Sequence, residues 1–499
     1  MRVFMLGWEF PPFITGGLGT ACHGLTRALD ARGVGVTFVM PGATDPSAAA
    51  HVDLLSPESL ATKTSPPITT KQTEHEAEDE ASPDLTDRAA SEPHTHSAED
   101  IDSSPNPHEE QMEFIHLPVR LLHPYSSEAS SIPVGRVGMQ RLVTEPEQHA
   151  SQSHSAESPD DTPSPEGDPD VQEADPPPSG TSDYGGDMFA EVRRFAQFAR
   201  LAAAGRTFDV IHAHDWMTYP AGLEVARRTG RPLIVHVHST EFDRSGEQVN
   251  QQIYDIERRG MHGAMRVITV SRLTRNIVIH RYGVAPDKVT VVYNGVAIDP
   301  IERGVQPIGR REKIVLYFGR ITRQKGPEFF IRAAARVLEV QKNVRFIVAG
   351  SGDLYRRCIE LAAELGIGQH FLFTGFLRGA DIDKVFAMAD LFVMPSVSEP
   401  FGIAPLEAMG HDVPVLISKS SGASEVLTHA LKCDFWDTEA MADKIVAVLR
   451  HPPLGQTLRR HGVIDVRRLT WDDAAAKCAR VYEDVASHFP ARPHGMGGS

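Results

Sequence analysis

The sequence predicts two doubly wound α/β domains, in which helices cover both faces of a largely parallel sheet. The 499 residues exceed what a single hydrophobic core usually supports. Short runs rich in β-branched residues alternate with helical stretches, as buried parallel strands do in such domains. Because this alternation starts again after about residue 312, we expect a first domain over 1–300 and a second over 301–470.

The first domain begins with an apolar strand at Arg2–Leu6, which a loop rich in Pro and Gly follows. The spacing of Leu25, Ala28 and Leu29 fits a 3.6-residue period and predicts a helix over about Thr20–Arg32. The other elements expected here are strands at Val34–Met40, Val210–Ala213, Leu233–Val237, Val267–Val270 and Val289–Val292 and an amphipathic helix at Met188–Ala204.

The second domain repeats the pattern. Its expected strands are Lys313–Phe318, Arg345–Ala349, His370–Thr374, Leu391–Met394 and Val413–Ile417. Helices are predicted between them, for example at Glu328–Leu338 and Leu354–Leu365. Ligands of doubly wound domains bind beyond the carboxyl ends of the strands, and most of the unusual motifs in this sequence stand at such ends.

Two acidic tracts interrupt the first domain. Residues 56–111 and 144–183 each carry a net charge of −11, so the rest of the chain carries +6 of the total of −16. Both tracts are rich in Ser, Pro and Glu, a composition that predicts disordered insertions in loops. Met112–Tyr125, which lies between them, is expected to form a strand and a turn. The mildly basic remainder permits an anionic ligand.

Several classes of protein are excluded by composition. No run of about 18 apolar residues exists, so we expect no integral membrane segment. The start of the chain lacks the basic residues, apolar run and cleavage site of a signal peptide. The four cysteines lie far apart and form no CxxC pair, which fits a reduced cytoplasmic location.

A glycine loop, Gly16-Gly17-Leu18-Gly19, separates the first strand from the first helix. Glycines let the backbone approach an anion, and a helix N-terminus offers free N–H groups to it. The loop is not the GxGxxG of dinucleotide-binding domains. A tight turn without a ligand is an equally good interpretation of this motif alone.

His212 and His214 end the strand that precedes Trp216. Two residues apart on an extended strand, they share one face of the sheet. A metal site needs at least one more ligand in register, and none is visible nearby in the sequence. A pair of histidines that bonds only to the backbone is the alternative to a site in the cleft.

Two cations, Arg320 and Lys325, stand five residues apart on a Gly-bounded loop after the Lys313–Phe318 strand. Fixed cations at this spacing suit a pyrophosphate, although a salt-bridged surface loop would have the same pattern. Two carboxylates follow the Leu391–Met394 strand: Glu399 in the loop, and Glu407 about one turn inside the next helix. They suit the hydroxyls of a sugar or a ribose, whereas either one alone is also explained by the helix dipole.

Together these motifs resemble the retaining glycosyltransferases of the GT-B fold, and most of all family 4 with its glycogen synthase-like members. The resemblance covers everything except the two acidic tracts. It rests on WEFPPFITGGLGT (8–20), HAHDW (212–216), FGRITRQKG (318–326), AGSGD (349–353), TGF (374–376) and SEPFGIAPLEAM (398–409). It implies two Rossmann-like domains that face each other across a cleft, with the first on the acceptor side and the second binding the nucleotide-sugar. Residues 471–489 then look like the last helix, which crosses back to the first domain.

The resemblance implies roles for ten residues. Catalytic roles fall to His214, Arg320, Lys325 and Glu399, and donor-binding roles to Gly17, Gly19, Phe376, Gly402, Ile403 and Glu407. The two cations would hold the donor diphosphate. Glu399 would contact the donor sugar and Glu407 the ribose hydroxyls. His214 would contact the sugar that is transferred, and Phe376 would border the pocket of the base.

No catalytic metal is expected, and the nucleotide-sugar is a substrate rather than a cofactor. A metal-dependent transferase needs a DxD motif at the end of an active-site strand. Asp100/Asp102 and Asp168/Asp170 lie inside the acidic tracts, and Asp381/Asp383 looks like the start of a helix. The cations are therefore left to neutralise the departing diphosphate.

The function implied is transfer of a hexose, glucose in the leading hypothesis, from ADP- or UDP-glucose to an α-glucan with retention of configuration. Thr15 stands where bacterial glycogen synthases have a lysine, and those enzymes lack the counterpart of Glu407. Both differences favour family 4 and leave the base of the donor open. Another acceptor, either a small sugar or a lipid, is the first alternative. A nucleotide-sugar epimerase and a non-catalytic sugar-binding protein fit the cations and carboxylates less well. No nucleic acid partner is expected.

Overall fold

A computed structural model describes residues 1–10, 17–42, 51–56, 186–297 and 312–489. Both acidic tracts and the strand expected at Met112–Tyr125 lie outside this part of the chain. So does the expected boundary near residue 300, and the domain ranges therefore stay a prediction. Within the described residues, no helix combines the length and the apolar character that crossing a bilayer requires.

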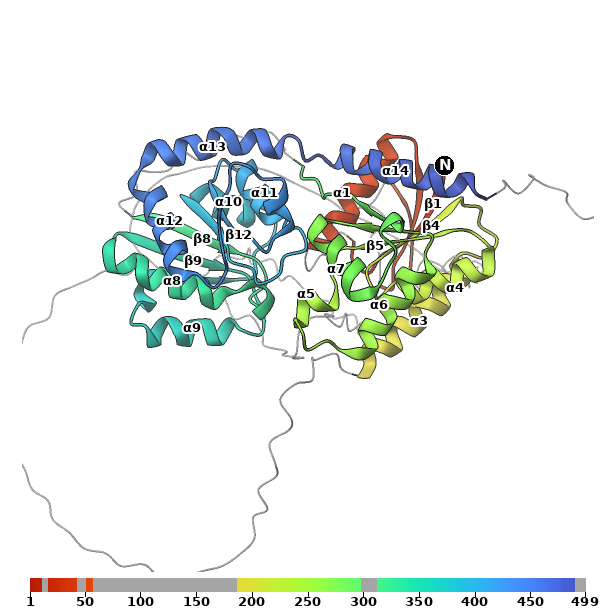
Figure 1. The fold of residues 1–499 in the computed structure, drawn as a ribbon, viewed down its shortest axis with the longest axis horizontal. Helices are drawn as coiled ribbons and strands as arrows, with labels where there is room; N and C mark the ends of the chain where they lie inside the picture. The colour runs from red at the N-terminus through yellow and green to blue at the C-terminus, as the bar shows by residue number, and fades with distance from the viewer. Residues whose placement is uncertain (11–16, 43–50, 57–185, 298–311, 490–499) are drawn as a thin grey trace, which may run out of the picture.

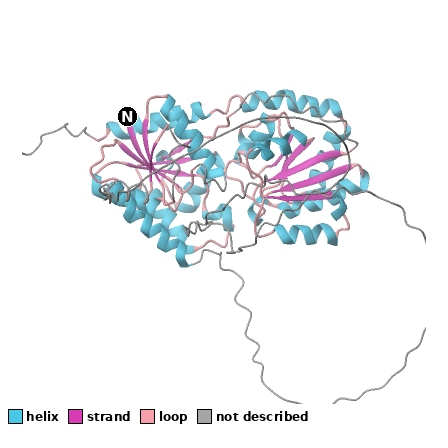
Figure 2. Cartoon of the chain, turned by 180° about the vertical axis from the view of Figure 1, so that it is seen from behind, coloured by secondary structure: helices cyan, strands magenta, loops and turns pink. Residues whose placement is uncertain are grey.

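The chain forms two parallel sheets with helices on both faces, which confirms the predicted fold class (Figures 1 and 2). The first sheet has the order β3-β2-β1-β4-β5-β6-β7 and the second the order β10-β9-β8-β11-β12-β13. In each sheet the strand order reverses beside the first strand, at β1/β4 and at β8/β11. This reversal opens a crevice at the carboxyl ends of the strands, where doubly wound domains bind ligands.

The first sheet consists of β1 (Arg2–Leu6), β2 (Gly35–Val39), β3 (Asp53–Leu55), β4 (Val210–His214), β5 (Leu233–Val237), β6 (Arg266–Thr269) and β7 (Val289–Val291). Its helices are α1 (Gly17–Ala31), α3 (Gly186–Ala202), α4 (Tyr219–Thr229), α5 (Glu241–Ser245), α6 (Gln251–Gly263) and α7 (Arg272–Tyr282), with a short 3-10 turn η2 (Pro286–Lys288). Every residue of β4 and β5 is buried, which fits their central place in a sheet covered on both faces.

The second sheet consists of β8 (Lys313–Phe318), β9 (Val344–Ala349), β10 (Phe371–Gly375), β11 (Leu391–Met394), β12 (Val415–Ser418) and β13 (Leu431–Cys433). Its helices are α8 (Pro327–Val340), α9 (Tyr355–Glu364), α10 (Ala380–Met388), α11 (Ala404–Gly410), α12 (Thr438–Arg450) and α13 (Pro452–Val466). Three 3-10 turns complete it: η3 (Arg323–Lys325), η4 (Gly368–His370) and η5 (Gly422–Glu425). The edge strands β3 (Asp-Leu-Leu) and β13 (Leu-Lys-Cys) were not among the predicted elements, because they contain no β-branched residue, whereas the equally short β7 (Val-Thr-Val) was predicted from its composition.

We call the first sheet with its helices the first half of the molecule and the second sheet with its helices the second half. The last helix, α14 (Trp471–Ser487), follows α13 of the second half but packs on α1 of the first half (Figure 1). Trp471 lies against Gly24, and Cys478 and Tyr482 are fully buried in the same apolar cluster as Leu25. An ion pair of 2.7 Å between Arg32 and Asp472 closes the contact at the surface. The apolar face of α14 therefore completes one side of the first core.

Candidate active site

Lys325 and Glu399 form the central ion pair of the second half. The Nζ atom of Lys325 lies 2.5 Å from Oε2 of Glu399, which also accepts a hydrogen bond of 3.2 Å from the hydroxyl of Ser396. The two charged side chains are only 19% and 7% exposed. Their burial lowers the screening of the charges, so a phosphate or a sugar that replaces one partner would feel a strong field.

The backbone of η3 explains why Lys325 lies there. Gly326 has φ +64°, and a Cβ atom at this position would lie 2.2 Å from the carbonyl oxygen of Pro395. Only glycine fits both the left-handed conformation and this close approach. The turn therefore lies directly against the loop after β11, and Lys325 is held within reach of Glu399.

Arg320 is joined to the same loop through Gln324, a residue that the sequence did not single out. Nη2 of Arg320 donates to Oε1 of Gln324 at 3.4 Å, and Nε2 of Gln324 donates to the carbonyl of Ser398 at 3.1 Å. The hydroxyl of buried Tyr317 donates to the carbonyl of Arg320 at 2.8 Å. The structure thus brings Arg320, Lys325 and Glu399 together around one pair of loops.

Glu407 lies in α11, one turn inside the helix, at the position expected from the sequence. Burial, and then the nearby charge of Asp383, raises the pKa of Glu407 to about 7. Gly402 and Ile403 precede the helix, and Gly402 has φ +97°. The carboxyl group of Glu407 therefore changes its protonation near neutral pH, and it is ionised above that pH.

Phe376 stands apart from these groups. It follows the edge strand β10, which β9 and β8 separate from β11. Its ring is 49% exposed, and the guanidinium of Arg378 lies 5.2 Å from the centre of the ring. An exposed ring is free to stack on a planar base, but within the described residues no hydrogen bond or ion pair ties Phe376 to the Lys325 loop.

In the first half, four imidazoles cluster on β4 and at the end of β5. His212 and His214 share a face of β4, as predicted, and their ring centres are 4.2 Å apart. Nδ1 of His212 is 2.7 Å from the hydroxyl of Tyr482, and Nδ1 of His214 is 2.9 Å from Nε2 of His238. His214 is fully buried in this structure rather than exposed to a cleft, and its Nε2 has no partner among the described residues.

The expectation that no third ligand lies near this pair was wrong. His236 of β5 is directly opposite His214 in the register of the two strands, and ring nitrogens of His212, His214 and His236 lie within 4.8 Å of one another. The sequence did not reveal this contact because it depends on how two strands align. The nearly parallel rings of His212 and His236, 8° apart, do not aim their in-plane lone pairs at one point, and among the residues that the structure describes no carboxylate joins the set.

The imidazoles of this cluster are neutral at physiological pH. Burial is the main cause: it lowers the pKa of His212 and of His238 to about 3, and it holds the pKa of His214 well below its usual range. The neighbouring rings lower the pKa of His214 further. His214 is therefore suited to donate or accept a hydrogen bond, and not to carry a charge.

Asp215 holds the ends of β4 and β5 together. It adopts φ +59°, and its Oδ1 accepts hydrogen bonds from the backbone N–H groups of His238 (2.7 Å) and Ser239 (3.2 Å). Burial raises the pKa of Asp215 to about 7, against the opposing effect of these hydrogen bonds. Because His238 bonds to His214, Asp215 fixes the imidazole cluster indirectly.

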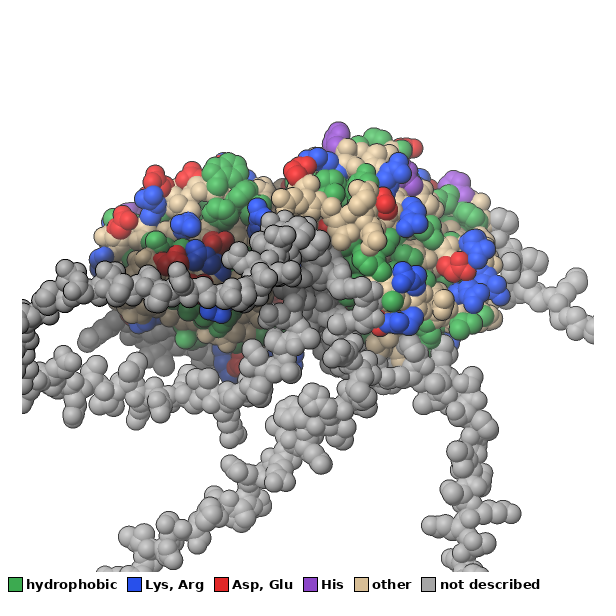
Figure 3. Space-filling view, turned by 90° about the horizontal axis from the view of Figure 1, so that it is seen from below, with side chains coloured by type: hydrophobic (Ala, Val, Ile, Leu, Met, Phe, Trp, Pro, Cys, Tyr) green, Lys and Arg blue, Asp and Glu red, His purple; other side chains and the backbone are tan. Residues whose placement is uncertain are grey.

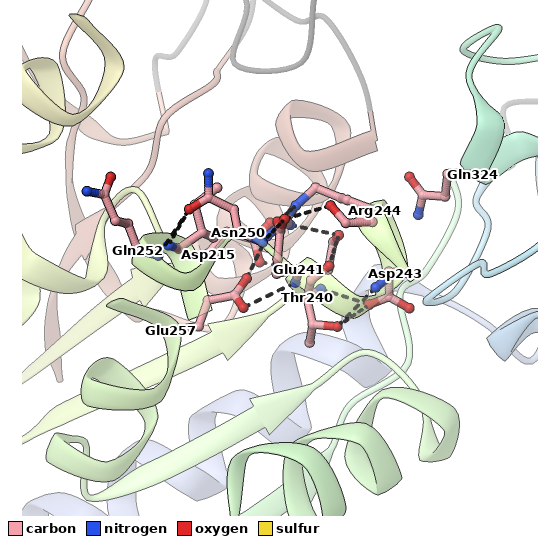
Figure 4. Close-up of polar contacts among 12 residues, drawn as sticks. Asp215, Thr240, Glu241, Asp243, Arg244, Asn250, Gln252, Glu257 and Gln324 are labelled. Carbon is pink, nitrogen blue, oxygen red and sulfur yellow. Dashed lines mark hydrogen bonds and ion pairs between the residues drawn. The ribbon is translucent and has the colours of Figure 1, made fainter. Parts of the chain in front are cut away.

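A buried polar network places the short helix α5 beside the second half (Figure 4). Arg244 pairs with Glu241 at 3.1 Å and with Glu257 at 2.6 Å, and all three side chains are at most 7% exposed. Thr240 and Asp243 form a capping box at the start of α5, and Asp243 also accepts a hydrogen bond of 2.6 Å from the hydroxyl of Ser398. This bond joins the first half to the loop that carries Glu399.

Further contacts join the two halves near the same place. A Cβ atom at Gly17 would lie 4.0 Å from Cδ1 of Ile403, so the start of α1 faces the start of α11. Gly19 is buried inside α1. Glu425 accepts hydrogen bonds from the first two backbone N–H groups of α7, at 2.9 and 2.7 Å, and from the hydroxyl of Tyr293. Several predicted site residues thus lie at or beside the contact between the two halves.

Three family models match the chain. The one described as Glycosyl transferases group 1 matches residues 299–462, Glycosyltransferase Family 4 matches 153–300, and the starch synthase catalytic domain matches 2–79. An uncharacterized glycosyltransferase of Methanocaldococcus jannaschii is 33% identical over 297 residues, which cover 55% of this chain and 75% of the relative. D-inositol 3-phosphate glycosyltransferase 1 of Catenulispora acidiphila is 26% identical over 320 residues, with coverage of 59% and 77%.

Solved structures show the same fold. Sucrose-phosphate synthase from Thermosynechococcus elongatus matches with a TM-score of 0.62 at 17% identity, over 98% of this chain and 99% of that one. Anabaena HepE, solved with UDP and glucose, matches with a TM-score of 0.59 at 16% identity, over 97% and 99%.

The two doubly wound halves and these matches define the class as the GT-B fold. The chain belongs to the glycosyltransferases of this fold and is a nucleotide-sugar-dependent enzyme.

Proposed function

We propose that this glycosyltransferase moves glucose from ADP- or UDP-glucose to an α-glucan, with retention of the anomeric configuration. The observation that carries the proposal is the buried Lys325–Glu399 ion pair, which lies beside Arg320 and at the contact between the halves. The match to the starch synthase catalytic domain supports a glucan acceptor, and the UDP and glucose bound by Anabaena HepE support a nucleoside diphosphate donor.

The proposed chemistry follows from the charges of the site. Breaking the anomeric C–O bond leaves a positively charged sugar and a diphosphate with growing negative charge. Lys325 and Arg320 neutralise that diphosphate, while Glu399 contacts the donor sugar. Glu407 accepts hydrogen bonds from the ribose hydroxyls, and the backbone N–H groups of Gly402 and Ile403 hold sugar and phosphate. The departing phosphate takes the proton of the acceptor, and the acceptor attacks on the same face.

His214 contacts the transferred sugar in this proposal, and because its imidazole is fully buried in this structure, the bound donor must displace the side chains that cover it. Its neutral imidazole would bond to a hydroxyl of the transferred sugar through Nε2, while Nδ1 stays bonded to His238. Gly17 and Gly19 bring the backbone of α1 close to the phosphates, and Phe376 borders the base.

A screen of donors and acceptors tests this function. ADP-glucose and UDP-glucose are each offered with glycogen, maltose, inositol phosphate and no acceptor. Transfer to glycogen and maltose with an α-linked product is expected. Transfer to inositol phosphate instead would match the named activity of relatives at 26% identity and would replace the glucan proposal. Turnover without an acceptor would favour an epimerase.

A lipid acceptor would favour a basic patch facing the membrane, and the arginines between residues 250 and 282 are the candidates for one. It is the weaker alternative, because three of them are engaged within the protein. Arg281 pairs with Glu247 at 2.5 Å, Arg266 pairs with Asp484 at 2.9 Å, and Arg275 donates to the carbonyl of Pro286. Seen from below, basic and apolar side chains alternate with acidic ones on both halves (Figure 3).

The four cysteines are buried thiols without disulfide bonds, which supports a cytoplasmic enzyme.

Chelation is expected to leave the activity unchanged. In the proposed reaction Arg320 and Lys325 do the work of a metal at the diphosphate, so a purified sample in excess EDTA should keep its full initial rate. The assay is the release of nucleoside diphosphate before and after chelation. A loss of rate that a divalent cation restores would contradict this expectation and would direct attention to His212, His214 and His236.

Donor binding is expected to weaken as the pH falls through 7. Because the raised pKa of Glu407 is about 7, its carboxylate predominates above that pH and its neutral acid below it. The neutral acid is a poorer acceptor for ribose hydroxyls, so KM for the donor should rise roughly ten-fold between pH 8 and pH 6. Glu407→Gln should have a high KM that no longer changes over this range. A wild-type KM that is flat with pH would contradict the role of Glu407.

A further inference from the structure

A pocket of about 250 Å³ lies in the second half, on the side of η3 and the first turn of α8. Its walls include Arg323, Pro327, Phe329, Leu354, Val397 and Phe435. None of these residues has a role in the donor site described above. The side chain of Arg323 is exposed, so the pocket combines an apolar floor with a polar rim.

Three aromatic side chains run from this pocket to the surface. The rings of Phe329 and Phe435 are 5.2 Å apart at 66°, and those of Phe435 and Trp436 are 4.8 Å apart at 88°. Trp436 is 60% exposed, the most exposed aromatic side chain of the described residues. Trp436 does not line the pocket itself, but its ring contacts Phe435, which does, so the exposed indole extends the apolar surface of the pocket into a contiguous patch of the kind that marks binding sites.

The pocket adjoins the donor site. Arg323 belongs to the same 3-10 turn as Lys325, and Val397 precedes Glu399 by two residues in the loop after β11. Ser398, between Val397 and Glu399, bonds to Asp243 of the first half. A chain-like molecule that reaches the contact between the halves can therefore continue onto this pocket and the aromatic residues beside it.

We propose that Phe329, Phe435 and Trp436, here named the aromatic ramp, bind a stretch of the α-glucan away from the reacting end. Pyranose rings present apolar C–H faces, which pack on aromatic rings, and hydroxyl edges, which bond to groups such as the guanidinium of Arg323. A nucleotide is a poorer match, because the carboxylate of Glu328 lines the same pocket as the guanidinium of Arg323 and would repel phosphate groups. This inference rests on the glucan acceptor of the proposed function and adds a second contact for its chain.

The test measures glucan binding separately from turnover. Migration through gels that contain glycogen gives the affinity of wild type, Trp436→Ala and a matched control, Val340→Ala. Val340 is 56% exposed at the end of α8 and does not line the pocket. We expect Trp436→Ala to bind glycogen about ten-fold more weakly, and its KM for glycogen to rise as much. Its rate with maltose, which is too short to reach the ramp, should be unchanged, as should both properties of Val340→Ala.

Fluorescence gives a second readout that does not depend on the substitution to alanine. Trp8 and Trp216 are buried and Trp471 is half-buried against Gly24, so the far more exposed Trp436 contributes most of the emission that acrylamide quenches. Maltoheptaose should protect this emission in the wild type, and Trp436→Phe should abolish the protected component.

The inference and the proposed function fail differently. If wild type transfers glucose to glycogen but Trp436→Ala binds glycogen normally and maltoheptaose protects no emission, the ramp is not a glucan site and the function stands. If wild type neither binds glycogen nor uses it, both are wrong.

Discussion

Lys325→Ala is expected to lower kcat by about 10²–10³-fold, the usual effect of removing one group that stabilises charge in a transition state. In the structure Lys325 is a buried cation whose charge is balanced by Glu399 at 2.5 Å. When the diphosphate departs, Lys325 would neutralise it in a site with little water. The KM for the donor should change much less than kcat, because the charge grows chiefly in the transition state.

The matched control for this variant is Lys384→Ala. Lys384 forms an ion pair with Asp381 on the surface of α10, where both side chains are more than 60% exposed, and surface pairs of this kind contribute little. Its kcat should equal that of wild type. Since Lys325→Ala leaves a buried carboxylate without its cation, thermal melting of both variants is needed. A folded Lys325→Ala variant with nearly normal kcat would contradict the proposal that Lys325 stabilises the departing diphosphate.

His214→Ala is expected to lower kcat by about 10²-fold. Removal of one hydrogen-bonding group that stabilises a transition state usually has an effect of this size. Nδ1 of His214 is fixed by His238, and its buried Nε2 has no partner among the described residues, a combination that His212 shares through Tyr482. Because burial holds its pKa well below the usual range, His214 should not add a titration to the rate profile between pH 5 and pH 9.

His280→Ala is the control for the histidine variant. His280 is exposed on the last turn of α7, so its loss should leave both kcat and stability unchanged. His214→Asn adds a second comparison, since an amide keeps a polar partner for His238 and should melt closer to wild type than His214→Ala. The role of His214 would be refuted by a folded alanine variant whose kcat stays within a few-fold of wild type.

Much of the fold could be predicted from the sequence because it depends on local patterns. The predicted strands Arg2–Leu6, with its four apolar residues after Arg2, and Lys313–Phe318 match β1 and β8 residue for residue. The edge strands β3 and β13 were missed, because they contain no β-branched residue and are defined only by pairing with one neighbouring strand, whereas the equally short β7 has the sequence Val-Thr-Val. Strands buried on both faces of a parallel sheet are nearly continuous apolar runs, and such runs can be recognised in the sequence.

The candidate site could be predicted only in part. Lys325 and Glu399, 74 positions apart, were singled out separately, and the structure shows that they pair. His236 was missed because its place opposite His214 depends on strand register. Gln324 and Asp215 were missed for a related reason: each acts by tying two loops or strand ends together, and neither has a spacing that reveals such a role. The only indication of Gln324 and Asp215 in the sequence was that each is a polar residue next to a motif at the end of a strand.

The most direct measurement is a crystal structure of the chain with its nucleoside diphosphate and glucose. The account predicts diphosphate oxygens within hydrogen-bond distance of Lys325 Nζ and the Arg320 guanidinium, with the sugar between Glu399 and His214. A diphosphate bound elsewhere on the chain, with the Lys325–Glu399 pair untouched and no ligand between the halves, would contradict it.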